Sequence, residues 1–178
     1  MISILGSGAH ADDISTLCGR IGVECSMFDH HEQAPTDVRD YVIGINDPRT
    51  RAEARERFGK HEWAAWPLID PTVVSEYGNY ARGVVIAAGS VLLSVDLGVH
   101  AHVNVHATVI RAQIGAFTTI APGVTICGDV TIGARCMIGA GAVIKNLVSI
   151  GDDVTVGAGA VVVNDIPDGA TVKGVPAR

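Results

Sequence analysis

The sequence of 178 residues has few aromatic and few basic side chains. Phe, Trp and Tyr together make up only 4% of it, whereas 48% is hydrophobic and 21 residues are glycine. This composition favours a repetitive core of closely stacked aliphatic side chains over a conventional β-sandwich. The formal net charge is −6 and no basic run is present. We therefore expect no nucleic-acid partner.

The sequence also lacks segments that would address it to a membrane. It contains no run of about 18 apolar residues, which a membrane-spanning helix requires. Its first twelve residues have neither the basic start nor the cleavage site of a signal peptide. The four cysteines (Cys18, Cys25, Cys127 and Cys136) show no CxxC spacing. We interpret them as reduced thiols and expect a cytoplasmic protein.

The N-terminal third has the order strand, glycine turn, helix, strand, followed by a second strand and helix. Residues 1–6 form an apolar run that ends in glycine, and the pair YVIGIND and PRTRAEARERFG repeats the pattern. This order is typical of a Rossmann-like unit. Gly6 and Gly8 would then form a phosphate-binding turn, with Asp29 placed for a ribose. A plain tight turn is the alternative, because the unit is too short for a complete dinucleotide fold.

A six-residue repeat dominates the rest of the chain. From Ile114 it reads IGAFTT, IAPGVT, ICGDVT, IGARCM, IGAGAV, IKNLVS, IGDDVT and VGAGAV. Each hexad predicts a short strand and a turn, and three hexads complete one triangular coil. The first-position aliphatic side chains then point inward and stack on those of the next coil. Glycine allows the turn backbone.

Two rungs of the repeat are one residue short. They are LLSVD, which starts at Leu92, and VIRAQ, which starts at Val109, and their starts are seventeen residues apart. A single deletion would break the register with the next coil, so we expect the short rungs to be neighbours on one locally flattened face.

The hexads, the GSGAHA segment and the closing VKGVPAR resemble the sialic acid O-acetyltransferase and bacillosamine N-acetyltransferase group of hexapeptide-repeat acyltransferases. The resemblance implies a mainly β fold, a left-handed parallel β-helix preceded by a small Rossmann-like α/β domain. We expect the α/β domain at residues 1–68 and the β-helix at residues 69–178. It also implies homotrimers, with active sites in clefts between neighbouring β-helices. Acetyl-CoA would be the co-substrate, and the acceptor an amine or hydroxyl of a nucleotide-linked sugar.

The resemblance assigns roles to particular residues. The Gly128 N–H would polarise the thioester carbonyl. The pantetheine arm would lie along Gly139, Ala140, Gly157 and Ala158, and the adenine end near Gly174, Val175 and Pro176. In the N-terminal domain, the nucleotide of the acceptor would contact Gly6, Gly8, His10 and Asp29. Relatives often carry Lys after the GHA segment, whereas this chain has Asp12 and Asp13.

The chain departs from this pattern at the catalytic base. Relatives carry a His followed by a carboxylate just after the ATV segment, and here that slot holds Arg111 and Ala112. Thr119 replaces a second common His. Arginine stays protonated and cannot act as a base. We consider three readings: His106 is the base, the acceptor is nucleophilic enough without one, or the protein is a non-catalytic ligand-binding or scaffold trimer. As a separate hypothesis, Arg111 would bind a carboxylate or phosphate of an altered acceptor.

A metal site is not expected. His100, His102 and His106 lie close together in the sequence, but their spacing matches no standard closed metal site. They can equally be a polar rim of the β-helix.

Overall fold

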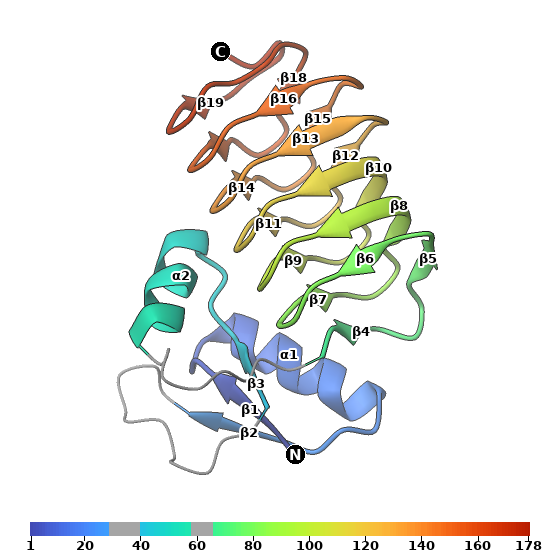
Figure 1. Cartoon of the computed structure of the whole chain (residues 1–178), viewed down its shortest axis with the longest axis vertical. Coiled ribbons are helices and arrows are strands. Elements are labelled where there is room, and N and C mark those ends of the chain that lie inside the picture. The colour runs from blue at the N-terminus through green and yellow to red at the C-terminus, as the bar shows by residue number, and fades with distance from the viewer. Residues whose placement is uncertain (29–39, 58–65) are drawn as a thin grey trace.

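The structure is a computed structural model, and it describes residues 1–28, 40–57 and 66–178. A small α/β domain lies at one end of a tall three-sided β-helix, and the C-terminus lies at the other end (Figure 1). Within the described ranges, no helix is long and apolar enough to cross a membrane.

The N-terminal domain has the strand and helix order that the sequence predicts. Its elements are β1 (Ile2–Leu5), α1 (Ala9–Arg20), β2 (Cys25–Phe28), β3 (Tyr41–Ile43) and α2 (Pro48–Arg57). The three strands form a parallel sheet in the order β2-β1-β3. Asp47 caps α2, since its carboxylate accepts a hydrogen bond from the Thr50 N–H at 2.8 Å.

The β-helix has three faces, each built from parallel strands of successive coils. The first face contains β4 (Leu68–Ile69), β7 (Val85–Ile86), β9 (His102–Val103), β11 (Thr119–Ile120), β14 (Met137–Ile138), β17 (Thr155–Val156) and β19 (Thr171–Val172). The second contains β5 (Val74–Glu76), β12 (Thr125–Ile126), β15 (Val143–Ile144) and β18 (Val161–Val162). The third contains β6 (Asn79–Tyr80), β13 (Val130–Ile132) and β16 (Ser149–Ile150). Two longer strands, β8 (Val91–Leu97) and β10 (Thr108–Ile114), run across both the second and the third face.

The hexad prediction is confirmed by burial. The first-position residues from Ile114 to Val156 are at most 3% exposed and belong to one continuous core: Ile114, Ile120, Ile126, Ile132, Ile138, Ile144, Ile150 and Val156. Strand pairs one coil apart keep the register that the repeat requires, for example Ile120 beside Ile138. The β-helix therefore holds its core as a stack in which each coil covers the next.

The short rungs are neighbours, as predicted. Leu92 pairs with Val109, and Val95 pairs with Ala112, in adjacent coils of β8 and β10. The rungs are shortened at the corner between the second and third faces, so β8 and β10 each continue through that corner without interruption. Ser94 (φ 57°) and Arg111 (φ 44°) make the bend. The first coil has the same seventeen-residue offset, because Val74 pairs with Val91, and the sequence reading missed this third short rung.

Three corners join the faces. We call them corner I (between the first and second faces), corner II (second and third) and corner III (third and first). From residue 85 to residue 154, each corner of each coil has one residue with a positive φ, as at His106 in corner I, Asp129 in corner II and His100 in corner III. A positive φ is conformationally unfavourable for residues other than glycine, and packing against the coils on either side offsets this cost.

The N-terminal domain packs against the first face. Ile4, Ile14 and Leu17 share an apolar cluster with Leu68 and Val85 of the β-helix. β4 begins at Leu68, so the first β-helix strand includes the last residue of the range expected for the N-terminal domain. The two parts are thus joined by a continuous apolar contact.

Arg51 of α2 fixes the second helix to the β-helix. Its side chain is fully buried and donates hydrogen bonds to the carbonyls of Ile45, Asn46, His100 and Phe117 and to the Thr119 hydroxyl. Burial lowers the pKa of Arg51 to about 9, against the opposing influence of Asp47. Among the described residues, no ion pair includes Arg51. The guanidinium is therefore held by oxygen dipoles from both domains.

Candidate functional site

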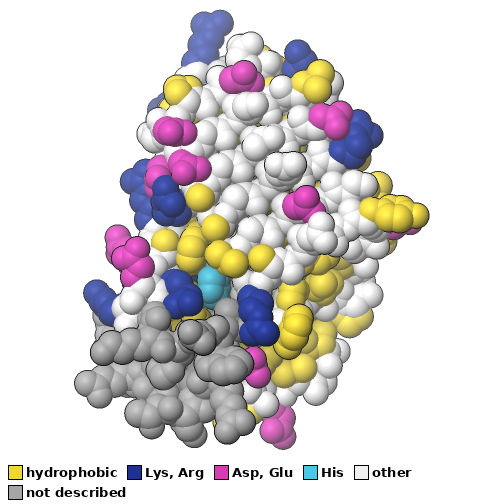
Figure 2. All heavy atoms as spheres, in the orientation of Figure 1, with side chains coloured by type: hydrophobic (Ala, Val, Ile, Leu, Met, Phe, Trp, Pro, Cys, Tyr) yellow, Lys and Arg dark blue, Asp and Glu magenta, His cyan; other side chains and the backbone are white. Residues whose placement is uncertain are grey.

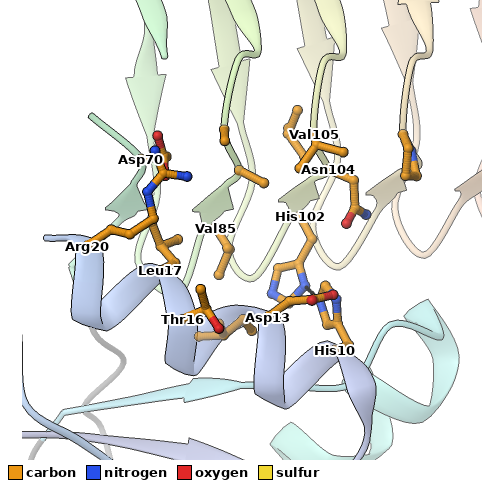
Figure 3. Close-up of a pocket in the computed structure, with 15 residues that line it drawn as sticks. His10, Asp13, Thr16, Leu17, Arg20, Asp70, Val85, His102, Asn104 and Val105 are labelled. Carbon is orange, nitrogen blue, oxygen red and sulfur yellow. Dashed lines mark hydrogen bonds and ion pairs between the residues drawn. The ribbon is translucent and has the colours of Figure 1, made fainter. Parts of the chain in front are cut away.

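A groove of about 300 Å³ runs between α1 and the first face (Figure 3). Its floor is mainly apolar, with Ile14 and Leu17 from α1 and Val85 and Val103 from the β-helix. The turn residues Ala88, Val105 and Pro122 form its edge at corner I. Its polar groups come from α1 on one side and from β9 and the β-helix turns on the other.

Two histidines from different domains meet in this groove. His10, in the first turn of α1, lies with its Nε2 atom 2.8 Å from Nδ1 of His102 in β9. His102 is 1% exposed, whereas His10 is half-buried. Burial lowers the pKa of His10 to about 4, with a further contribution from Arg51, and Asp13 acts in the opposite direction. The pKa of His102 is also lowered, mainly by burial. Both rings are neutral at pH 7.

Charged groups lie at both ends of the groove. At one end Arg20 and Asp70 form an ion pair with an N–O distance of 3.0 Å, and the Asp70 side chain is 2% exposed. Burial alone would raise the pKa of Asp70, but hydrogen bonds from Thr72 and the Arg20 guanidinium hold it below its ordinary value. At the other end Asp13 lies near the histidine pair (Figure 3). The groove therefore offers neutral imidazoles and carboxylates and, at its far end, one paired cation.

A ladder of small residues continues from the groove along corner I. Backbone hydrogen bonds join its rungs: Gly123 donates to Val105, Gly141 to Pro122, and Gly159 to Ala140. Ala140 and Ala158, predicted for the pantetheine arm, are exposed and extend the edge formed by Val105 and Pro122. A narrow thiol arm on this ladder would have its end at the mouth of the groove.

The glycines of this ladder also have a structural role. A Cβ atom on Gly139 would lie 2.6 Å from the backbone nitrogen of Ala158. At Gly157 it would lie 3.0 Å from the Lys173 side chain. Close stacking of the coils therefore requires Gly139, whatever ligand it contacts.

Gly128 and Arg111 lie at a different corner. Both are in corner II, where Arg111 forms an exposed ion pair with Asp129 at an N–O distance of 3.1 Å. The guanidinium lies over Gly128, because a Cβ atom there would come within 2.3 Å of an Arg111 nitrogen. Hydrogen bonding to Asp129 raises the pKa of Arg111 further, which excludes a role as a base. Within one chain, the structure therefore does not bring Gly128 together with the corner I ladder.

Comparison with known proteins identifies the repeat. The model for the bacterial transferase hexapeptide (six repeats) matches residues 111–146. PerB from Caulobacter crescentus, solved with CoA and GDP-perosamine, superposes with a TM-score of 0.92 at 27% identity, covering 99% of this chain and 95% of that one. The chain therefore contains the bacterial transferase hexapeptide repeat and has the fold of PerB.

Other solved structures match over the same length. The acetyltransferase domain of PglB from Neisseria gonorrhoeae, solved with acetyl coenzyme A, has a TM-score of 0.75 at 27% identity, with 99% of this chain and 97% of that one covered. WeeI from Acinetobacter baumannii shares the fold at 22% identity and a TM-score of 0.89, with coverage of 100% and 98%. No curated protein matches the sequence significantly.

The other described residues predicted to bind the two substrates lie at the ends of secondary-structure elements or in turns. Gly6 (φ 140°) follows β1, where a Cβ atom would lie 2.7 Å from the Gly44 carbonyl oxygen. Gly8 caps α1, and a Cβ atom there would meet nothing within 4 Å. Gly174, Val175 and Pro176 form an exposed turn after the last strand. Asp29 lies outside the described residues.

His106, the predicted base, is exposed at corner I. Its ring covers Gly89 of the previous coil, where a Cβ atom would lie 2.5 Å from the His106 Nδ1 atom. It therefore lies on the ladder that borders the groove. The described residues contain no group of three His, Cys, Asp or Glu that could hold a metal ion.

The sequence reading missed the importance of His102 and Arg51. The sequence analysis considered His102 only as part of a histidine cluster. The repeat predicts on which face of the β-helix a residue lies, but not which other segment packs against that face. Arg51 is one of four arginines in α2, and nothing in their spacing distinguishes the buried one. The signal for His102 was its position: it replaces a hydrophobic or small residue in a column that includes Val85 and Thr119.

Proposed function

We propose that the protein transfers an acetyl group from acetyl-CoA to an amino group of a nucleotide-linked sugar. The observation that carries this proposal is the superposition of nearly the whole chain on a GDP-perosamine N-acetyltransferase from Caulobacter crescentus solved with CoA and GDP-perosamine. The likeness includes the N-terminal domain, so it extends to the part of the chain that would hold the nucleotide.

The geometry of the groove supports an amine acceptor. Asp13 lines the groove near the histidine pair, and no unpaired cation is among the lining residues. A carboxylate favours an ammonium or amine group and disfavours a phosphate. We place the sugar in the groove, with its nucleotide toward Gly6, Gly8 and the first turn of α1.

Acetyl-CoA is assigned to the ladder of corner I. Its pantetheine arm would lie along Gly139, Ala140, Gly157 and Ala158, and its adenine end near Gly174, Val175 and Pro176. The thioester would then reach the mouth of the groove. Gly128 would have to come from the corner II of a neighbouring copy to polarise the carbonyl, which is the reason for proposing a homotrimer.

The test is a thiol-release assay with acetyl-CoA and a panel of GDP-, UDP- and dTDP-linked amino sugars, with mass spectrometry of the product. We expect a gain of one acetyl group on the sugar nitrogen and release of one CoA thiol per transfer. An unacetylated panel together with no stabilisation by acetyl-CoA in a thermal-shift assay would overturn the proposal.

Arg111 favours one alternative, a ligand-binding or scaffold protein without activity. It occupies the slot of the family base and is tied to Asp129. Such a protein would bind a nucleotide-linked sugar without consuming acetyl-CoA. Calorimetric binding of the sugar, in the absence of turnover, would identify this case.

A further inference from the structure

We propose that His10 is the proton acceptor in acetyl transfer and that His102 is its positioning residue. This inference rests on the proposed function. Arg111 cannot accept a proton, so the amine nitrogen needs another acceptor. The His10–His102 pair lies in the groove, at the end of the corner I ladder where the thioester would be.

The hydrogen bond between the two rings fixes their orientation. His102 is held in β9 between neighbouring strands, and its ring is buried. His10 comes from the other domain, so the bond at 2.8 Å sets the rotation of the His10 ring. Since Nε2 of His10 faces His102, Nδ1 of His10 is the nitrogen that can receive a proton from a bound substrate.

One assignment of protons satisfies this role. Neutral His10 carries its proton on Nε2 and donates to Nδ1 of His102, which leaves the Nδ1 lone pair of His10 free for the substrate. His102 then carries its proton on Nε2, an atom that is buried and has no hydrogen-bond partner in the described structure. When His10 becomes an imidazolium, His102 remains the acceptor of its Nε2–H, and this bond becomes charge-assisted.

The surroundings balance the charge on His10. Asp13, one turn further along α1, stabilises a positive ring, while Arg51 of α2 and burial oppose it. A proton acquired during the reaction is therefore held only briefly and is passed on. This suits a group that takes a proton from one atom and returns it to another in the same turnover.

The transfer balances as follows. The amine nitrogen attacks the thioester carbon, an N–C bond forms, and the carbonyl electron pair moves to oxygen. His10 Nδ1 takes one proton from the positively charged nitrogen. The oxygen electrons re-form the C=O bond as the C–S bond breaks, and the CoA thiolate takes the proton from His10. The products are an amide and CoA thiol, and His10 is neutral again.

The experiment compares His10→Ala, His102→Leu and His106→Ala, with Glu24→Ala as a control, since Glu24 is exposed beyond the end of α1 and does not line the groove. For His10→Ala we expect kcat to fall by about 10²- to 10⁴-fold. Added imidazole should restore part of the rate of His10→Ala alone, because the free ring can enter the space left by the side chain. His102→Leu should lower kcat while acetyl-CoA binding, measured by calorimetry, is retained.

The outcomes separate this inference from the proposed function. If wild-type protein acetylates no sugar in the panel, the proposed function fails. If wild type is active and His10→Ala keeps full kcat, the inference alone is overturned. It is also overturned if His106→Ala, and not His10→Ala, loses activity and is rescued by imidazole. Loss in His10→Ala without rescue, together with weakened binding of the nucleotide-linked sugar, would make His10 a binding residue only.

Discussion

At the residue scale, the buried Arg51 side chain depends on its hydrogen bonds for its stability in the fold. Within residues 1–28, 40–57 and 66–178 it has no acidic partner, and it donates hydrogen bonds to carbonyl oxygens from the N-terminal domain and from corner III. Such a group is stable only if every one of its donors is used, because a buried cation without partners costs several kcal/mol. The arrangement makes the contact between the two domains specific and not merely apolar.

Replacing Arg51 by Met should therefore destabilise the protein by about 3 kcal/mol or more, because several buried oxygens lose their donor. Urea unfolding at pH 7 measures this change. Arg49→Met, on the same helix, removes an exposed ion pair to Asp153 and should cost less than about 1 kcal/mol. Equal effects of the two substitutions would contradict the anchoring role of Arg51.

His100 predicts a pH dependence of stability. Its ring stacks between Tyr41 and Phe117, with centroid distances of 5.9 and 5.3 Å. Burial, with Arg55 and Arg51 nearby, lowers its pKa to about 4. Below its ordinary value of 6.5 the unfolded chain takes up a proton that the folded chain does not. The stability due to a neutral His100 is thus complete above pH 6.5 and is lost as the pH falls toward 4.

His100→Phe should keep the ring stack and remove this titration. Phe117 already has a positive φ at the same corner, so Phe is tolerated there. Between pH 7 and pH 5, the variant should lose less stability than wild type by on the order of 1–2 kcal/mol. Urea unfolding at the two pH values tests this difference. Parallel losses in the two proteins would show that His100 does not titrate as described.

At the element scale, the sequence specifies the β-helix far better than it specifies the groove. The repeat itself identifies the packing partner of each inward Ile or Val, because that partner is the equivalent residue one coil away. The contact of α1 with the first face has no such period. It depends on which residues of two unlike surfaces meet, so His10 and His102 are separated by 92 residues and no local pattern links them. The third short rung was missed because its coil precedes the regular repeat.

The corner I ladder leads to a prediction about the co-substrate. Ala140 is exposed there, and a large side chain would block a pantetheine arm without disturbing the core. Ala140→Trp should raise the KM for acetyl-CoA at least about tenfold, equivalent to 1.4 kcal/mol of binding. Ala134→Trp, one hexad earlier at corner III, is the matched control. A similar rise in both variants would place acetyl-CoA elsewhere.

At the scale of the whole molecule, the placement of the corners argues for assembly. Charged side chains gather mainly toward the edges of the β-helix, while much of the face in view, the third face with β6, β13 and β16, is uncharged (Figures 1 and 2). The outward positions of the second face are Val or Thr in successive coils, as at Val143 and Thr125. A face of this kind suits contact with a second copy. Gly128 of corner II and Ala140 of corner I can then line the same cleft only if they belong to different copies.

This arrangement predicts that two impaired variants complement each other when the acetyl-CoA concentration is kept below the wild-type KM. Gly128→Val blocks the amide at corner II, where the added side chain displaces only the flexible end of Arg111. Ala140→Trp blocks the ladder at corner I. In a homotrimer refolded from equal amounts of both, a cleft is intact when its corner II comes from one variant and its corner I from the other. Random mixing makes about one cleft in four intact. Thiol release should recover to about a quarter of the wild-type rate, with light scattering confirming trimers of unchanged mass. Mixed trimers without recovered activity would mean that both residues act within one chain, or that neither lies in the cleft.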